Sequence, residues 1–221
     1  MAIVWGWAST VEAYAAGGRK VDVPRAGCPS CRAPMAFWSG YWRHLRVDGD
    51  VGWKIWVRRG RCSSCRVSHA LLPSFCLVGR SFGVEVIGPA VSEAVGGKGT
   101  RSVARAVGVA QSTARSWCRR HSDRSRVAHA VAVMVGSAVG LGVAAVVSPV
   151  EVSVLSVLQR LAGVACEREG LGRWPAVSLV TSGMWLVPVG SARPTTLRVF
   201  PDGNERRLMA LIDPNDETRP P

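Results

Sequence analysis

Residues 100–120 have the sequence TRSVARAVGVAQSTARSWCRR, the most informative segment of the chain. Apolar residues recur at helical spacing on both sides of Gly108, a residue that can adopt the left-handed conformation of a tight turn. Ala104 is small where two helices must approach each other, and Val103 and Trp117 supply apolar contacts. The pattern predicts a helix-turn-helix, in which two short helices meet at a turn.

The second predicted helix carries polar and basic side chains on the face opposite its packed residues. In a helix-turn-helix this helix enters the major groove of DNA, where Gln can pair with adenine and Arg with guanine. The expected contacts to bases come from Gln111, Ser112, Thr113, Arg115 and Arg119. The expected contacts to phosphates come from Arg101, Arg120, Arg124, Arg126, Arg58, Arg59 and Arg61. The alternative is an ordinary basic helical hairpin.

The charge distribution favours a polyanionic partner. The 221 residues hold 28 Lys and Arg against 15 Asp and Glu, which gives a net charge of +13. Residues 1–126 contain 20 basic and 7 acidic residues, so all of the net charge lies there. Nucleic acid and an anionic membrane surface are both compatible with this balance. The length holds one medium domain or two small ones, which excludes a large multidomain enzyme.

Two Cys-x-x-Cys pairs precede the helix-turn-helix. Cys28 and Cys31 form the first pair and Cys62 and Cys65 the second, with 30 residues between the pairs. Each turn directs two thiolates to one point, and two such turns supply the closed tetrahedral set of sulfur ligands that structural zinc prefers. The sequence therefore predicts a structural Zn²⁺ ion held by these four cysteines. A redox pair and structural disulfides are the alternatives.

The segment between the pairs predicts a β-hairpin. Residues 37–47 and 53–61 are rich in aromatic and β-branched residues and are separated by Asp48-Gly49-Asp50. Basic residues alternate there with tryptophans. Such a ribbon can follow a phosphate backbone, or its tryptophans can fill a small core while arginines keep it in solution. His44 and His69 are possible substitute ligands, but four cysteines leave no position for them.

A family resemblance rests on these motifs. A four-cysteine zinc ribbon followed by a helix-turn-helix resembles the N-terminal DNA-binding region of bacterial insertion-sequence transposases. More narrowly, RGRCSSCRVSHALLPSF at 59–75, then the helix-turn-helix, then Trp174 and LVTSGMWL at 179–186 resemble a bacterial family of zinc-ribbon and helix-turn-helix proteins associated with mobile elements. The resemblance implies a DNA-binding role in transposition, integration or its regulation, with a recombinase or transposase as a partner.

No catalytic constellation is evident in the sequence. An RNase H-type nuclease needs three carboxylates that converge on two metal ions, whereas five of the eight acidic residues after residue 126 lie in the tail. Tyr14 and Tyr41 are the only tyrosines, and Ser182 lacks a nearby base. We therefore expect that the chain is not an enzyme.

The apolar run Ala130–Val147 has no charged residue and reaches the lower limit for a membrane-spanning helix. A membrane-tethered DNA-binding regulator is therefore the alternative function. The run contains three glycines and little leucine, and the N-terminus lacks the basic region of a signal peptide. We expect a buried helix, a protein that does not insert into membranes, and a cytoplasmic location associated with the nucleoid.

Together these patterns predict a mainly α protein with a small β zinc ribbon, a three-helix helix-turn-helix unit and further C-terminal helices. The expected segments are a poorly ordered lead-in at 1–26 with one short helix around residues 9–16, the ribbon at 27–76, the DNA-binding domain at 82–126, a helical packing or association region at 127–190 and a polar tail at 191–221. The expected function is zinc-containing, sequence-specific binding of double-stranded DNA. A homodimer would suit paired half-sites.

Overall fold

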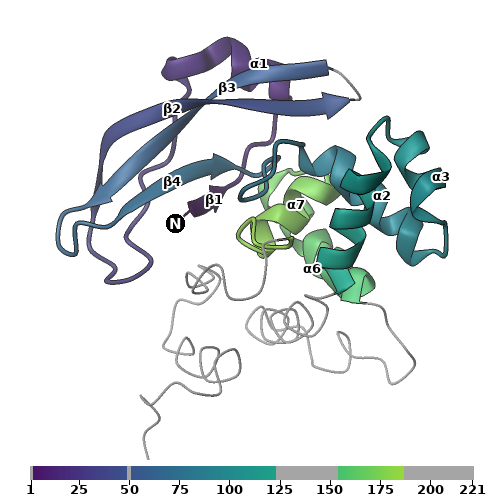
Figure 1. The fold of residues 1–221 in the computed structure, drawn as a ribbon. Helices are drawn as coiled ribbons and strands as arrows, with labels where there is room; N and C mark the ends of the chain where they lie inside the picture. The colour runs from purple at the N-terminus through teal and green to yellow at the C-terminus, as the bar shows by residue number, and fades with distance from the viewer. Residues whose placement is uncertain (1, 49–50, 123–153, 187–221) are drawn as a thin grey trace, which may run out of the picture.

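The computed structural model describes residues 2–48, 51–122 and 154–186 (Figure 1). Arg124, Arg126, the apolar run 130–147 and the predicted tail 191–221 lie outside these ranges. Within the described residues, no helix is both long enough and apolar enough to cross a membrane.

A four-stranded mixed sheet occupies the N-terminal part of the chain, with strand order β1-β4-β3-β2. The strands are β1 (Ala2–Trp5), β2 (Met35–Asp48), β3 (Val51–Cys62) and β4 (Ser68–Pro73). The prediction of a mainly α protein is therefore wrong. The sheet exceeds the expected ribbon because β2 and β3 contain 14 and 12 residues, and because β1 and β4 add two further strands.

The predicted hairpin is confirmed as β2 and β3, which pair antiparallel along almost their whole length. Aromatic and β-branched residues dominate both strands, as is typical of a pleated, half-buried surface. The register shifts between Phe37 and Ser39, so Trp38 is an extra residue on β2. On one face of the hairpin Leu45, Ile55 and Val57 are completely buried.

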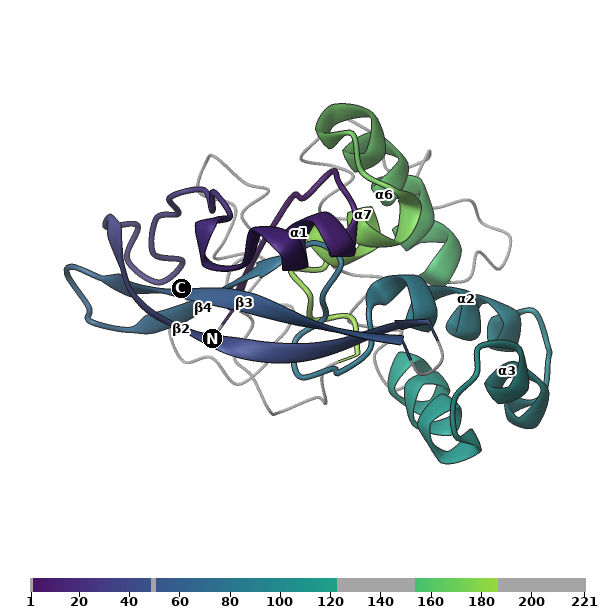
Figure 2. The same cartoon turned by 90° about the horizontal axis from the view of Figure 1, so that it is seen from above.

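The N-terminal segment is an integral part of the sheet. β1 pairs in parallel with β4. The helix α1 (Val11–Gly17) follows, capped at its start by the side chain of Thr10, which accepts a hydrogen bond from the backbone N–H of Ala13. A single 3₁₀ turn, η1 (Gly18–Lys20), ends it. Figure 2 shows α1 alongside β3, where Tyr14 is fully buried and donates a hydrogen bond to the carbonyl of Trp56 at 3.0 Å. α1 lies where a short helix was expected within the lead-in, around residues 9–16, whereas the strand β1 was not expected.

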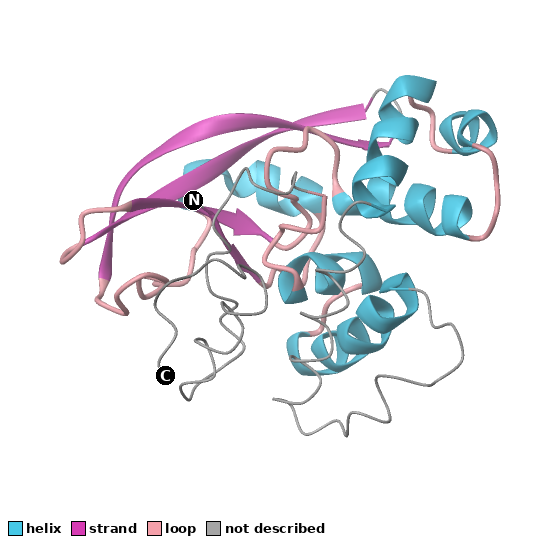
Figure 3. Cartoon of the chain, turned by 60° about the horizontal axis from the view of Figure 1, so that its bottom comes forward, coloured by secondary structure: helices cyan, strands magenta, loops and turns pink. Residues whose placement is uncertain are grey.

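Helices form the second part of the molecule, and Figure 3 shows most of them gathered on one side of the sheet. They are α2 (Val84–Val95), α3 (Thr100–Ala106), a helix over residues 111–122, α6 (Val154–Glu169) and α7 (Arg173–Val180). Their buried side chains form one apolar cluster, and the buried side chains of the sheet and α1 form another.

The connecting segment 74–83 is hydrogen-bonded to both parts. On the sheet side, the backbone N–H of Gly83 donates to the carbonyl of Arg46 at 2.7 Å. On the helical side, the hydroxyl of Ser178 donates to the carbonyl of Cys76 at 2.6 Å. The guanidinium of Arg80 donates to the carbonyl of Leu186, also at 2.6 Å. These contacts fix the helices relative to the sheet.

Candidate functional site

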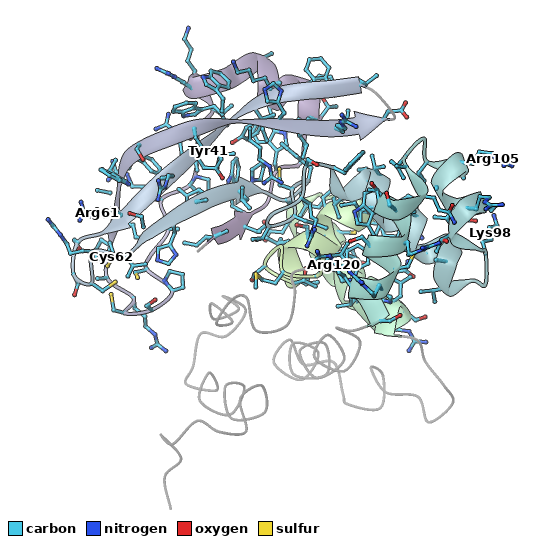
Figure 4. All side chains as sticks on the ribbon, in the orientation of Figure 1. Tyr41, Arg61, Cys62, Lys98, Arg105 and Arg120 are labelled. Carbon is cyan, nitrogen blue, oxygen red and sulfur yellow. The ribbon has the colours of Figure 1, made fainter. Side chains whose placement is uncertain are left out.

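Two cysteine turns meet at one end of the sheet. Cys28 and Cys31 precede β2, Cys62 ends β3, and Cys65 lies in the turn before β4. The four sulfur atoms all lie within 4.8 Å of one another. The closest pairs join the two turns, at 3.5 Å for Cys28 and Cys65 and 3.3 Å for Cys31 and Cys62. Figure 4 shows Cys62 at the end of the sheet remote from Lys98 and Arg105.

The two turns have the same backbone construction. In the first, the N–H of Cys28 donates to the carbonyl of Ala33 at 2.8 Å, and in the second the N–H of Cys62 donates to the carbonyl of Val67 at 3.0 Å. The residue after the second cysteine is left-handed in both, with φ of 62° at Arg32 and 61° at Arg66. Each Cys-x-x-Cys-Arg segment therefore curls back on itself and brings its thiols together.

The sulfur positions fit a tetrahedral metal ion. Zinc–sulfur bonds of about 2.3 Å in a tetrahedron place neighbouring sulfurs roughly 3.8 Å apart. The observed closest separations are slightly shorter than this value, and both exceed the length of a disulfide bond, about 2.05 Å. The four predicted ligands are thus brought together, and this group could hold a metal ion. All-sulfur tetrahedral sites are typical of structural zinc.

The thiol pKa values show why a cation suits this cluster. The backbone N–H of Ala33 and the thiol of Cys62 lower the pKa of Cys31 to about 6. At Cys65 the N–H of Val67 lowers the pKa, but desolvation and the three other thiols raise it to about 12. Four thiolates this close repel one another, and a divalent cation relieves that repulsion.

His69 is a neighbour of this cluster that the sequence did not assign to it. The imidazole is fully buried, and its Nε2 lies 3.8 Å from the sulfur of Cys28. Burial lowers the pKa of His69, which favours the neutral ring. A neutral imidazole beside a ligand can donate a hydrogen bond to the sulfur and orient it. Its place four residues after Cys65, on the adjoining strand, is the signal in the sequence that points to this position.

Two helices meet at Gly108, and their buried residues match the packing pattern predicted from the sequence. Gly108 has φ of 65°, in the left-handed region, between α3 and the helix over 111–122. Val103 and Ala114 are completely buried, and Ala104 and Trp117 are nearly so. The small side chain of Ala104 lets the two helices approach, as the sequence indicated.

The predicted base-contacting residues fall into two groups. Ser112, Arg115 and Arg119 are exposed, at spacings of three and four that place them on one face of the helix. Gln111 and Thr113 are half-buried near its start. Residues 111–122 contain three arginines and no acidic residue, so this face carries only positive charge.

The predicted phosphate contacts that the structure describes lie on three elements: α3, the helix over 111–122 and β3. Arg101 is exposed on α3, whereas Arg120 is half-buried and donates from Nε to the hydroxyl of Ser116 at 3.2 Å. Arg58, Arg59 and Arg61 are half-buried on β3, far along the chain from the helix. Figure 4 shows Arg61 near the cysteine end of the sheet and Arg120 in the helical part, so these two arginines lie in separate parts of the molecule.

Aromatic side chains hold the helix over 111–122 from two sides. Trp117 packs edge-on against Phe82, with ring centroids 5.2 Å apart, and Arg46 of β2 lies over the same Phe82 ring. At the other side, the indole N–H of Trp185 donates to Nδ1 of His121 at 3.1 Å in a buried contact. The exposed face is thus carried on a rigid support.

One comparison with known proteins gives a match. A family described as a domain of unknown function (DUF6431) matches residues 28–117, which is less than half of the chain. The matched region begins at the first cysteine of the cluster and ends within the helix over 111–122. No curated protein and no solved structure matches the chain.

Proposed function

We propose that this chain is a zinc-containing protein that binds double-stranded DNA with a sequence preference. The helix over 111–122 lies in the major groove and its exposed face reads bases. The observation that carries the proposal is the position of Ser112, Arg115 and Arg119 on one exposed face of the second helix, opposite the buried Ala114 and Trp117.

Charge and rigidity support the same proposal. The net charge of +13 supplies the electrostatic attraction that non-specific DNA binding needs. The contacts of Trp117 and His121 fix the helix orientation, which base recognition requires because a bidentate pair tolerates little displacement. Zinc at the four cysteines stabilises the end of the sheet and takes no part in reading the sequence.

The resemblance to mobile-element proteins leads to a narrower proposal. We propose that the chain acts in transposition or integration, or in its regulation, alongside a recombinase or transposase. A homodimer would place two such helices one helical turn of DNA apart. Binding sites at the ends of mobile elements would support the recombination role, whereas sites upstream of genes would support regulation.

The experiment is sequencing of genomic fragments retained by the zinc-loaded protein at about 150 mM salt, where binding to phosphates alone is weakened. A discrete shared motif is the expected result. Arg115→Ala is expected to relax the preference at one position of that motif by about 1–3 kcal/mol. Arg105→Ala is the matched control, because Arg105 is exposed on α3 outside the reading helix. Retention of fragments without any motif would contradict the proposal.

A further inference from the structure

One face of the β2–β3 hairpin carries three aromatic rings, each with a cation over it. The charged groups lie 4.4–5.3 Å from the ring centroids. The pairs are Arg19 over Trp56, Lys54 over Trp42 and Arg58 over Phe37. We call these six residues the ring–cation face.

The strand register places these residues together. Trp42 is directly opposite Trp56, and their rings meet edge-on with centroids 5.2 Å apart. Arg58 is opposite Gly40, whose lack of a side chain leaves room for a ring: a Cβ atom there would lie 2.4 Å from the ring of Trp56. Gly40 therefore lets the indole lie across the sheet.

The ring–cation face is exposed where a folded domain normally buries aromatic rings. Trp42 is 41% exposed and Phe37 is 37% exposed. β2 is also the edge strand of the sheet, so a partner can approach from its side. From Phe37 to Trp42 the strand covers about 16 Å, enough for several nucleotides.

The charge of the hairpin is strongly positive. Residues 35–62 contain six basic residues and two acidic residues, Asp48 and Asp50, which are close together in the sequence. Cations beside flat, exposed rings are complementary to a ligand that alternates anionic groups with flat aromatic groups. An acidic peptide would satisfy the cations and leave the rings without a matching partner.

We propose that the ring–cation face binds single-stranded DNA, with bases stacked on Trp42 and Phe37 and phosphates beside Lys54 and Arg58. Bases in a duplex are stacked on one another and present no free ring face, whereas an unpaired strand does. The inference does not rest on duplex binding by the helix over 111–122, because it uses other residues on another element.

The test measures fluorescence anisotropy of a labelled oligothymidylate about 15 nucleotides long, with the zinc-loaded full chain at about 50 mM salt. Trp42→Ala and Phe37→Ala are each expected to weaken binding by roughly 5-fold to 100-fold. Trp38→Ala is the matched control. Trp38 is 54% exposed on the same strand, but its cation is Arg61, which alternation along β3 places on the opposite face from Arg58.

An abasic strand of the same length separates stacking from charge attraction. Weaker binding of the abasic strand, together with loss in the two variants and a near-parental Trp38→Ala, would support the proposal. Absence of binding, equal binding of the abasic strand, or equal loss in Trp38→Ala would overturn it. If Trp42→Ala loses zinc or circular dichroism signal, the variant is misfolded, and binding by Phe37→Ala and Lys54→Ala tests the proposal instead. Lys54 is exposed, so its removal should leave the fold intact. Duplex binding measured in parallel tests the proposed function separately.

Discussion

The cysteine end of the sheet and the helical part of the molecule are held together by different forces. At the cysteine end, four sulfurs lie within 4.8 Å of one another, and a cation would be needed for all four to coexist as thiolates. In the helical part, apolar side chains and stacked rings such as Trp174 and Trp185 exclude water without any ion. The stability of the cysteine end should therefore depend on bound metal, and the stability of the helical part should depend on side-chain packing. The difference can be tested one region at a time.

The largest expected effect is that of Cys62→Ser. Structural zinc contributes about 10–16 kcal/mol of apparent binding free energy in small zinc modules, so losing one of four ligands should release the metal and unfold the cysteine turns. Zinc content measured after dialysis is the readout, and the helical circular dichroism should persist. Cys118→Ser is the control, since Cys118 lies outside the cluster. Retained zinc in Cys62→Ser would refute the site.

Gly88→Ala should destabilise the helical part by about 2–3 kcal/mol and leave zinc content unchanged. A Cβ atom at Gly88 would lie 2.1 Å from the ring of Trp174, so the rings must move. Gly163→Ala in α6 is the matched control, because nothing lies within 4 Å of its Cβ position. It should instead stabilise the helix by about 0.5–1 kcal/mol. Urea unfolding followed by circular dichroism distinguishes the two outcomes.

Acidification should lower the stability of the helical part because His121 is buried there. Burial lowers the pKa of His121 in the folded protein, so below the unfolded value of about 6.5 the unfolded chain binds a proton that the folded chain does not. Stability is therefore complete above that pH and falls as the pH drops toward the folded pKa.

The matched variant for this prediction is His121→Gln, which keeps an acceptor for the indole of Trp185 and does not titrate. The fall in the unfolding midpoint between about pH 7.5 and 5.5 should be smaller in the variant. Zinc release is measured in the same samples, because acid also protonates thiolates and any loss of metal must be separated from the effect of His121. An identical fall in both proteins would show that His121 is not responsible.

The smallest expected effect is that of Arg66→Gly. Arg66 is left-handed at φ 61°, a conformation that costs a residue with a side chain about 1 kcal/mol and glycine much less. A stability gain of a few tenths of a kcal/mol at the cysteine end should remain after the entropy of glycine in the unfolded chain is subtracted. Arg66→Ala keeps the strain and should show no gain. A lower zinc affinity in both variants would indicate that the charge of Arg66 matters more than its backbone.

Local signals in the sequence predicted the cysteine cluster and the two helices that meet at Gly108. The spacing within each Cys-x-x-Cys turn is enough to predict that its two thiols lie close together. Ala104, Gly108 and Trp117 lie within about twenty residues of one another, and their spacing predicts how the two helices pack. The hairpin was predictable for the same reason, since aromatic and β-branched strands flank a turn.

Long-range pairing was not predictable in the same way. The residues of β1 were expected to be part of a poorly ordered lead-in. Four residues are too few to show a period of their own, and they form a strand by pairing with β4, whose residues lie 68 positions later. His69 and Trp185 were also missed as supporting residues. Each acts through a partner, Cys28 or His121, that is distant in the chain.

The matched family region, 28–117, is smaller than the packed unit. It lacks β1 and α1, which complete the core of the sheet, and it lacks Trp174 and Trp185, which complete the helical core. A protein trimmed to that region would expose apolar side chains that the full chain buries. Experiments on this chain should therefore keep residues 2–186.

The contact between Trp185 and His121 sets an order of events during synthesis on the ribosome. The two residues are 64 positions apart, so the helix over 111–122 leaves the exit tunnel well before its support does. At about 5–20 residues per second the delay is roughly 3 to 13 s. Throughout this interval the nascent chain presents an arginine-rich helix whose indole partner has not yet been translated.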